Sequence, residues 1–490
     1  MMEWKMLLTQ TRLQDEKSDP KVFGDYYISP FERDYERIVS NAAFRRLQDK
    51  TQVFPLSKSD FVRTRLTHSI EVSTIAKQLG IMCFQNTSSY QHLPIDNDED
   101  GNEELKIQRA GDIEAILSCA GLLHDLGNPP FGHVGEAIIG EWFKNNLKNV
   151  YALKCEDEKP VYAMLNERMI ADLEHFEGNA QTFRILTKAR YRSEINLPFS
   201  ILSALIKYPT RSTEKGKALI RHKTGYYYSE ENSFTHIAQE TGTIRADETV
   251  VRHPLAYLVE AADDIAYLTA DLEDAVKSGV VSVEDLLSFF KNTYQPLGDE
   301  LSESRQHTAY TKEIIDELDS FNQIEKNKTM VMSQWGTYLR KWLMYVACWR
   351  FSKSYDEILQ GEYQYDLFYK NNHSLTVKLL RNAMSEFVFD SRIIVEPEVS
   401  AQNILNFLLD KFVPAVVRFD HYGKMTTQDE KVITLISSNY IEDYFKAKEA
   451  ENLTDEAELL YRRILIATDF ISGMTDGYAK ALYRKMSGIE

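Results

Sequence analysis

The segment HDLGNPPFGHVGE, residues 124–136, decides how this 490-residue chain is interpreted. It opens with an imidazole and a carboxylate, His124 and Asp125, at the end of an apolar stretch with helical periodicity. The glycine and prolines that follow end that helix, because proline cannot continue it. A buried helix end with a His nitrogen and a carboxylate oxygen suits a divalent metal such as Mn, Fe, Ni, Co or Mg. Two adjacent ligands do not hold a metal, so we expect further ligands from other segments.

Side chains of the same chemical types interrupt the apolar faces of two other segments. His68 lies in RTRLTHSIEV (63–72), and Asp263 and Asp264 lie in EAADDIAYLTADLEDA (260–275). A lone His or Asp at such a place is usually a core group with satisfied hydrogen bonds, since an unpaired buried carboxylate is costly. Three apolar segments that all carry such side chains favour a shared metal site.

The hydrophobic pattern predicts a mainly α-helical chain. Apolar residues recur at helical spacing over 66–83, over 113–123 with Asp112 as N-cap, and over 254–279. Alternating patterns are scarce, and the best short strand candidates are 226–228 and 392–395. We expect a further helical region after about residue 310.

Composition and charge exclude several classes of protein. With 43% apolar residues the chain can bury a sizeable core, so extended disorder is excluded. The net charge of −17 disfavours anionic membranes and unassisted binding of nucleic acid; single-stranded nucleic acid stays open as a partner, although the charge does not indicate it. The four cysteines form no CxxC pair, and no apolar run is long enough to span a membrane, so we expect a cytoplasmic protein. Six basic and two acidic residues occupy 45–65, just before His68, and could meet an anionic ligand.

Six segments carry a resemblance to a known family. The order of His68, His124–Asp125 and Asp263 resembles that of the HD-domain metallo-phosphohydrolases. The fuller segments resemble the bacterial dGTP/dNTP triphosphohydrolases: RDYERIVSNAAFRRLQDKTQVFPL (33–56), RTRLTHSIEV (63–72), HDLGNPPFGHVGE (124–136), FEGNAQTFRIL (176–186), EAADDIAYLTADLEDA (260–275) and ISGMTDGYA (471–479). This resemblance implies an HD-domain helical core with the metal and substrate site in 1–310. It also implies a C-terminal helical region, 311–490, with oligomer or regulatory contacts.

The resemblance assigns the metal ligands and the catalytic pair. The ligands are His68, His124, Asp125 and Asp263; Asp263 is chosen over its neighbour because the family's ligand lies four residues before a Tyr, here Tyr267. The catalytic residues are His133 and Glu136, which are three residues apart and therefore face the same way on a helix. A carboxylate beside an imidazole raises its pKa and orients it for proton transfer. Many relatives carry a His where this chain has Gly178, so we expect His133 to carry the acid–base work.

The resemblance also names residues for the substrate. Arg65 shares a helical side with His68 and is expected on the phosphates, where arginine binds in a bidentate manner. Lys223 belongs to a second, degenerate phosphate segment that could equally be a solvated loop. Tyr267 and Asp271 follow Asp263 at steps of four, for the deoxyribose face and the 3′-hydroxyl. Gln52 and Asn179 match family positions near the nucleoside.

The implied activity is metal-dependent hydrolysis of dGTP or several dNTPs to deoxynucleoside and triphosphate, with Mn²⁺ or Mg²⁺ as cofactor and Fe, Co or Ni as alternatives. The family resemblance also implies a homo-oligomer, commonly a hexamer, and a dNTP as a candidate allosteric activator. Two alternatives stay open: an HD phosphohydrolase acting on another nucleotide, and an inactive HD-fold nucleotide sensor. The phosphate product separates the first alternative from triphosphate release.

Overall fold

The computed structural model describes residues 1–14, 29–53, 62–84, 103–151, 159–188, 195–216, 219–300, 305–369, 374–389, 392–420 and 425–489. Within these ranges the chain is built of helices, and the only β-type pairing is three isolated bridges. The prediction of a mainly α-helical fold is therefore confirmed.

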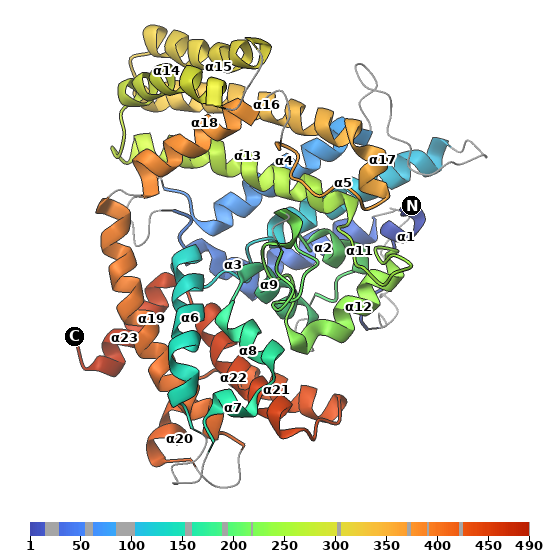
Figure 1. Cartoon of the computed structure of the whole chain (residues 1–490), viewed down its shortest axis with the longest axis vertical. Coiled ribbons are helices and arrows are strands. Elements are labelled where there is room, and N and C mark those ends of the chain that lie inside the picture. Colours follow the sequence, from blue (N-terminus) through green and yellow to red (C-terminus); the bar gives the residue numbers. More distant parts are fainter. Residues whose placement is uncertain are drawn as a thin grey trace.

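The first helices run up to the central helix α13 (Figure 1). They are α1 (Trp4–Leu7), α2 (Pro30–Ser40), α3 (Ala42–Arg45), α4 (Arg65–Phe84), α5 (Glu103–Leu123), α6 (Gly132–Asn146), α7 (Val161–Met164), α8 (Glu167–Glu174), α9 (Gly178–Thr187), α11 (Phe199–Ala204), α12 (Glu231–Glu240) and α13 (Pro254–Lys277). Short 3₁₀ turns lie at Arg46–Asp49, Leu147–Asn149, Leu219–Arg221 and Tyr228–Glu230.

The remaining helices confirm a helical region after residue 310. They are α14 (Val283–Glu300), α15 (Arg305–Ile324), α16 (Lys328–Lys353), α17 (Tyr355–Leu359), α18 (Ser374–Met384) with a π-turn at Ser385–Phe389, α19 (Arg392–Arg418), α20 (Thr427–Ile433), α21 (Ser438–Ala450), α22 (Glu456–Ser472) and α23 (Asp476–Ser487).

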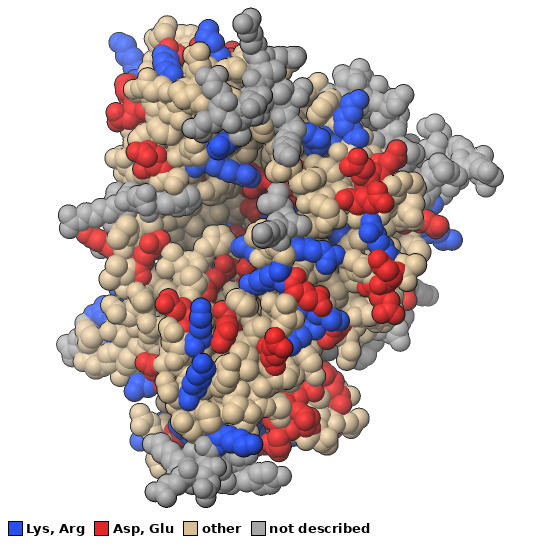
Figure 2. All heavy atoms as spheres, viewed as in Figure 1, with Lys and Arg blue, Asp and Glu red and all other residues tan. Residues whose placement is uncertain are grey.

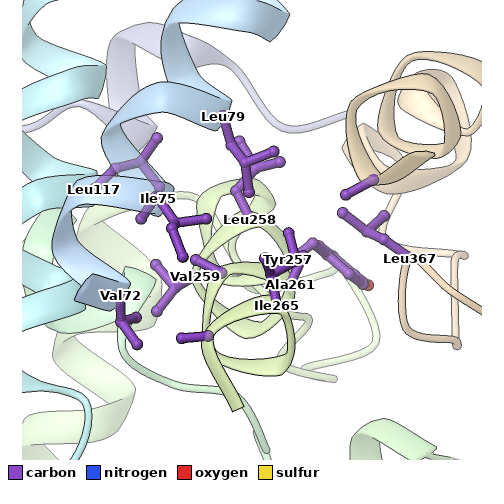
Figure 3. Packing of buried hydrophobic residues seen from close by; sticks show 14 of the residues in the cluster. Val72, Ile75, Leu79, Leu117, Tyr257, Leu258, Val259, Ala261, Ile265 and Leu367 are labelled. Atoms are coloured by element: carbon purple, nitrogen blue, oxygen red, sulfur yellow. The ribbon is translucent and has the colours of Figure 1, made fainter. Parts of the chain in front are cut away.

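The first hydrophobic core surrounds α13, which packs against α4, α5 and α16. Figure 3 shows Val72, Ile75 and Leu79 of α4 directed toward Leu258 and Ile265 of α13. These apolar side chains repeat at helical spacing along one side of each helix, so burying them aligns the two helices. The packing holds the segments with His68 and Asp263 side by side.

A close approach between α4 and α5 brings His124 and Asp125, which directly follow α5, near His68. A Cβ at Gly121 would lie 2.5 Å from the Cα of Ser73, so only glycine fits where the two helices cross. Gly121 lies three residues before His124, and Ser73 lies five residues after His68. The contact therefore sets the distance between the two histidines.

The second hydrophobic core joins α6 and α8 to α19 and α22 (Figure 1). Leu408 and Phe412 of α19 are fully buried there together with Ile139 and Phe143 of α6. The C-terminal helices thus pack directly on the helix that begins beside His133, while α16 and α18 belong to the first core.

Three local predictions are wrong. Asp112 does not cap a helix, because α5 begins at Glu103 and the Asp112 carboxylate accepts a hydrogen bond from Ser29 instead. Residues 226–228 form no strand and lead into a 3₁₀ turn, and residues 392–395 open α19. Short apolar runs read alike in helices and strands, which explains both strand errors.

The surface and the cysteines agree with the composition. Cys83, Cys119 and Cys348 are buried in the first core, as expected of small apolar residues. No helix in the described ranges is both long and apolar enough to cross a membrane. Basic and acidic side chains are interspersed over the face in Figure 2, so the net charge does not form one field of a single sign there.

Candidate metal and substrate site

Four side chains from three helical segments meet at the junction of α4, α5 and α13. One carboxylate oxygen of Asp263 lies 3.2 Å from Nε2 of His68 and 3.5 Å from Nε2 of His124. Asp125 Oδ1 lies 3.5 Å from the same His124 nitrogen. Ligand atoms of His68, His124 and Asp125 all lie within 4.8 Å of one another. The four residues predicted to hold a metal are thus brought together.

The state of His124 tests whether a cation fits this cluster. Its Nδ1 lies 2.8 Å from the carbonyl of Gly121, and a carbonyl only accepts, so Nδ1 carries the proton. Its Nε2 is buried and, among the described residues, makes no hydrogen bond. Burial lowers the pKa of His124, but the carboxylates of Asp125 and Asp263 outweigh burial and raise it. An unpartnered imidazole nitrogen between two carboxylates fits a divalent cation, which prefers these donor types.

Both carboxylates are ionised by their neighbours. Burial would raise the pKa of Asp125, but Arg65 and the histidines hold it far below its usual range. Burial opposes ionisation of Asp263 as well, and the ammonium of Lys207, paired with its second oxygen, outweighs it. Carboxylates have to be ionised to bind a metal, so their neighbours hold Asp125 and Asp263 in the form that binds one.

The two adjacent aspartates on α13 have different surroundings. Asp263 faces the two histidines, whereas Asp264 forms an ion pair with Arg381 of α18, with 3.0 Å between nitrogen and oxygen. Burial raises the pKa of Asp264 to about 7, which Arg381 only partly offsets. The geometry therefore separates a residue in the metal cluster from a neighbour held by an arginine.

The predicted catalytic pair lies at the start of α6. His133 Nδ1 is 2.9 Å from Glu136 Oε2, and the other oxygen of Glu136 accepts the N–H of Gly178 at 2.9 Å. The hydrogen bond and charge of Glu136 raise the pKa of His133. Burial favours the neutral form of Glu136, but its bond with His133 lowers its pKa instead. Each partner therefore stabilises the charged form of the other.

The position of Gly178 has a steric explanation. A Cβ there would lie 2.0 Å from Asn128 Oδ1 and 2.5 Å from Glu136 Oε1. Asn128 in turn donates a hydrogen bond of 2.6 Å to Asp125 Oδ1. A larger side chain at Gly178 would displace both neighbours, so this chain arranges Glu136 around a glycine.

A cavity of about 380 Å³ opens beside the cluster. Its size suits a small-molecule ligand. The predicted residues that line it are Gln52, Arg65, Asp125, His133, Asn179, Lys223, Asp263, Tyr267 and Asp271. All six predicted substrate residues thus share one cavity with Asp125 and Asp263 of the metal cluster and with His133, whereas His68, His124 and Glu136 are not among its lining residues. Burial and the nearby Asp274 raise the pKa of Asp271 far above its usual range, and its Oδ2 makes no hydrogen bond within the described ranges.

Sequence reasoning missed several residues of the cavity. Lys207 and Tyr208 line it, and Lys207 pairs with Asp263. Glu177 accepts from Asn179 at 2.9 Å and from Lys223 at 3.0 Å, so it holds two predicted substrate residues in place. No spacing rule points to Lys207, because it follows a short helix and pairs with a residue 56 positions away.

The basic run before His68 behaves differently from the expectation. Of its members only Arg65 lines the cavity; Arg45 and Arg46 are exposed, Lys58 lies outside the described residues, and Lys50 is buried against backbone carbonyls. Arg63 is bound by Glu71, Glu273 and Asp274. Sequence proximity therefore overestimated the positive charge at the site, which Lys207 and Lys223 supply from other segments.

Comparison with known proteins shows which family the chain belongs to. A family model described as the HD domain matches residues 65–173. The chain is 40% identical to a deoxyguanosinetriphosphate triphosphohydrolase-like protein of Listeria innocua, with all of both chains covered. It is 32% identical to a protein of the same description from Synechocystis, again over all of both chains. It is 30% identical to a deoxyguanosinetriphosphate triphosphohydrolase of Klebsiella pneumoniae, with 94% of each chain covered. The chain belongs to the deoxyguanosinetriphosphate triphosphohydrolase family.

The HD-domain match covers only part of the candidate site of this member of the deoxyguanosinetriphosphate triphosphohydrolase family. The matched residues 65–173 include His68, His124 and Asp125, together with the His133–Glu136 pair. Asp263 lies outside them on α13. The full-length likeness to the relatives covers this second half of the site, so the whole cavity belongs to the region of family similarity.

Proposed function

We propose that this chain is a metal-dependent deoxynucleoside triphosphate triphosphohydrolase, which converts a dNTP and water to deoxynucleoside and triphosphate. The observation that carries this proposal is one cavity, lined by the two aspartates of the His/Asp cluster, three basic side chains and the Tyr267–Asp271 stripe of α13. Family membership over the full length supports the same activity.

The His/Asp cluster is proposed to hold one divalent cation through His68, His124, Asp125 and Asp263. When bound there, such a cation lowers the pKa of a water ligand and polarises a phosphoryl oxygen. Mn²⁺ and Mg²⁺ are the proposed metals, and Fe, Co or Ni also suit the mixed nitrogen and oxygen donors.

The basic residues of the cavity are proposed to bind the phosphates. Arg65 stays beside Asp125 and, with its planar fork, orients a phosphoryl group against the cluster. Lys207 and Lys223 belong to other segments of the chain. Lys207 is paired with Asp263, and Lys223 is paired with Glu177. Their charges offset the repulsion between the triphosphate and the acidic groups of the cavity.

Proton transfer is assigned to His133. The oxygen of water forms a bond to the α-phosphorus and releases a proton to solvent, while the bond from that phosphorus to the 5′-oxygen breaks. The departing 5′-oxygen needs a proton to leave as a hydroxyl group. His133 can supply it as an imidazolium, because Glu136 stabilises the charged ring and fixes its orientation.

Selection of a deoxyribose is assigned to α13. Tyr267 is proposed to pack on the sugar face, where it would crowd a 2′-hydroxyl. The unpartnered oxygen of Asp271 is proposed to bind the 3′-hydroxyl. Gln52 and Asn179 are assigned to the nucleoside. A homo-oligomer, with a hexamer as its proposed size, and a dNTP as activator belong to the same proposal; a cytoplasmic location stays a prediction.

The test is a product assay with purified protein, Mn²⁺ or Mg²⁺, and the four dNTPs offered singly and as mixtures. Release of tripolyphosphate and deoxynucleoside is expected. Pyrophosphate or orthophosphate as the product, or no turnover in any mixture, would overturn the proposal. Mixtures also show whether one dNTP activates hydrolysis of another, and a nucleoside monophosphate and a cyclic dinucleotide serve as substrates for the alternative phosphohydrolase.

A further inference from the structure

The turn between α22 and α23 lies against the loop that precedes His133. The carboxylate of Asp476 accepts the N–H of Phe131 at 3.0 Å with one oxygen and the N–H of Thr51 at 3.2 Å with the other. Asp476 is only 2% exposed, so these bonds are shielded from water. A residue from the end of the chain thus holds two backbone segments at the edge of the cavity.

Phe131 is a position where the backbone needs such support. Its φ of 64° lies in the left-handed region, which a bulky residue rarely adopts. It occupies the N-cap position of α6 without a capping side chain, two residues before His133. Conformations of this kind persist when surrounding contacts over-determine them. The bond from Phe131 N–H to Asp476 is one of those contacts.

Lys50 makes a second connection between the same three segments. Its ammonium donates to the carbonyl of Asn128 at 2.6 Å and to the carbonyl of Ser472 at 2.7 Å. Its side chain is 3% exposed, and burial together with the nearby Arg65 lowers its pKa to about 7. Burying such a polar group costs free energy unless it is hydrogen-bonded, and both bonds of Lys50 go to backbone carbonyls. These two bonds hold the backbone of the loop at Asn128 next to that of Ser472.

The residues held in this way adjoin those that the chemistry uses. Asn128, whose carbonyl binds Lys50, donates its side-chain amide to Asp125. Thr51, held by Asp476, precedes Gln52, and both line the cavity. Neither Lys50 nor Asp476 is among the described residues that line it. Their effect on the reaction therefore has to pass through the backbone that they bind.

We propose that Lys50 and Asp476 are positioning residues of the active site, which fix the 128–131 loop and Thr51 so that His133 meets the substrate. This proposal rests on the function proposed above. It gives the ISGMTDGYA segment a role at the active site: Ser472 of α22 and Asp476 of α23 support a site whose proposed metal, catalytic and substrate residues all precede residue 280.

The test compares Asp476→Asn and Lys50→Met with Asp429→Asn. Asp429 is a matched control, because it is also a buried aspartate of the C-terminal region but binds Thr426 and Arg418, away from the cavity. The measurements are kcat and KM for the dNTP, Mn²⁺ affinity by calorimetry, the folded fraction by circular dichroism, and hydrogen exchange of peptides that cover 126–133.

We expect kcat to fall by about 10- to 100-fold in Asp476→Asn and Lys50→Met, because small displacements of reacting groups have costs of this size. Mn²⁺ affinity and the folded fraction should stay close to those of the wild type, and peptides covering 126–133 should exchange faster. The Asp429→Asn control should match the wild type in kcat and in exchange.

Unchanged kcat in both variants would overturn the proposal. So would an equal loss in the control, or a loss of folded protein that accounts for the loss of activity, because either result means a purely structural role. If the wild type releases no triphosphate from any dNTP, the proposed function fails instead. The exchange measurement needs no substrate, so it still decides whether Lys50 and Asp476 hold the loop.

Discussion

The metal cluster and the His133–Glu136 pair are built in opposite ways. The cluster joins residues from α4, from the turn directly after α5 and from α13 that are up to 195 positions apart, and the side chains of His68 and His124 are 1% and 3% exposed. The catalytic pair lies within one turn of α6, and its histidine is 76% exposed. The cluster depends on the packing of the first core, whereas the two members of the pair meet within one local turn, whose preceding loop is held by Lys50 and Asp476.

Because of this difference, we expect substitutions at the two sites to have different effects. Rigid packing suits groups that have to stay at fixed distances from a cation, while an exposed imidazole can follow a substrate and exchange its proton with water. We expect a change in the cluster to remove the cation and all turnover. A change in the pair should leave the cation in place and slow only the proton transfer.

The largest effect is expected from Asp263→Asn. An amide cannot supply the negative charge that this carboxylate offers to a cation between His68 and His124. Mn²⁺ binding by calorimetry should be lost, and turnover should fall to the background of the assay.

The matched control for this prediction is Asp264→Asn, on the same helix. Asp264 pairs with Arg381, and an asparagine can still accept a hydrogen bond from that arginine. Its Mn²⁺ affinity should stay within a few-fold of the wild type. Equal metal loss in the two variants would mean that the assignment of the ligand to Asp263 is wrong.

The next effect is expected from His133→Ala. Without the imidazole the departing oxygen loses its proton donor, so kcat should fall by about 10²- to 10⁴-fold. Mn²⁺ affinity should be that of the wild type, because His133 makes its side-chain bond to Glu136 and not to the cluster. Calorimetry that shows lost metal binding would contradict the separation of the two sites.

Local patterns of the sequence were sufficient to predict the main helices of the site and the His133–Glu136 pair. Helical spacing predicted α4 and α13, and the spacing from His133 to Glu136 predicted a pair that lies 2.9 Å apart. Resemblance supplied the ligand set that α4, α5 and α13 bring together. What the sequence could not show is contact between distant segments: Lys207 with Asp263 is an example. Such contacts depend on tertiary packing, for which one sequence carries no spacing rule.

Arg65→Lys should have an intermediate effect that tests the link between the two sites. Arg65 binds Asp125 with one nitrogen while its Nε is buried and makes no hydrogen bond in the described part of the chain. A lysine is a single point charge and cannot bind Asp125 and a phosphate with the same fork geometry. We expect KM for the dNTP to rise by about 10- to 100-fold. An unchanged KM would place the phosphates elsewhere in the cavity.

The smallest effect is expected from Glu136→Gln, measured as a pH profile of kcat. The Glu136 carboxylate raises the pKa of His133, so the imidazolium persists to higher pH in the wild type. If His133 donates its proton, kcat falls as pH rises through that pKa. Glutamine keeps a hydrogen bond but removes the charge, so the alkaline fall should begin at a lower pH, with less than about a tenfold loss at neutral pH.

The direction of that shift decides between two roles of His133. A proton donor loses activity on the alkaline side, whereas a proton acceptor loses it on the acidic side, and a lower pKa would then extend activity to lower pH. The exposed position of His133 lets solvent restore either form between turnovers. A profile that moves on the acidic side alone would make His133 the base that activates water, while an unmoved profile would remove the pair from the rate-limiting proton transfer.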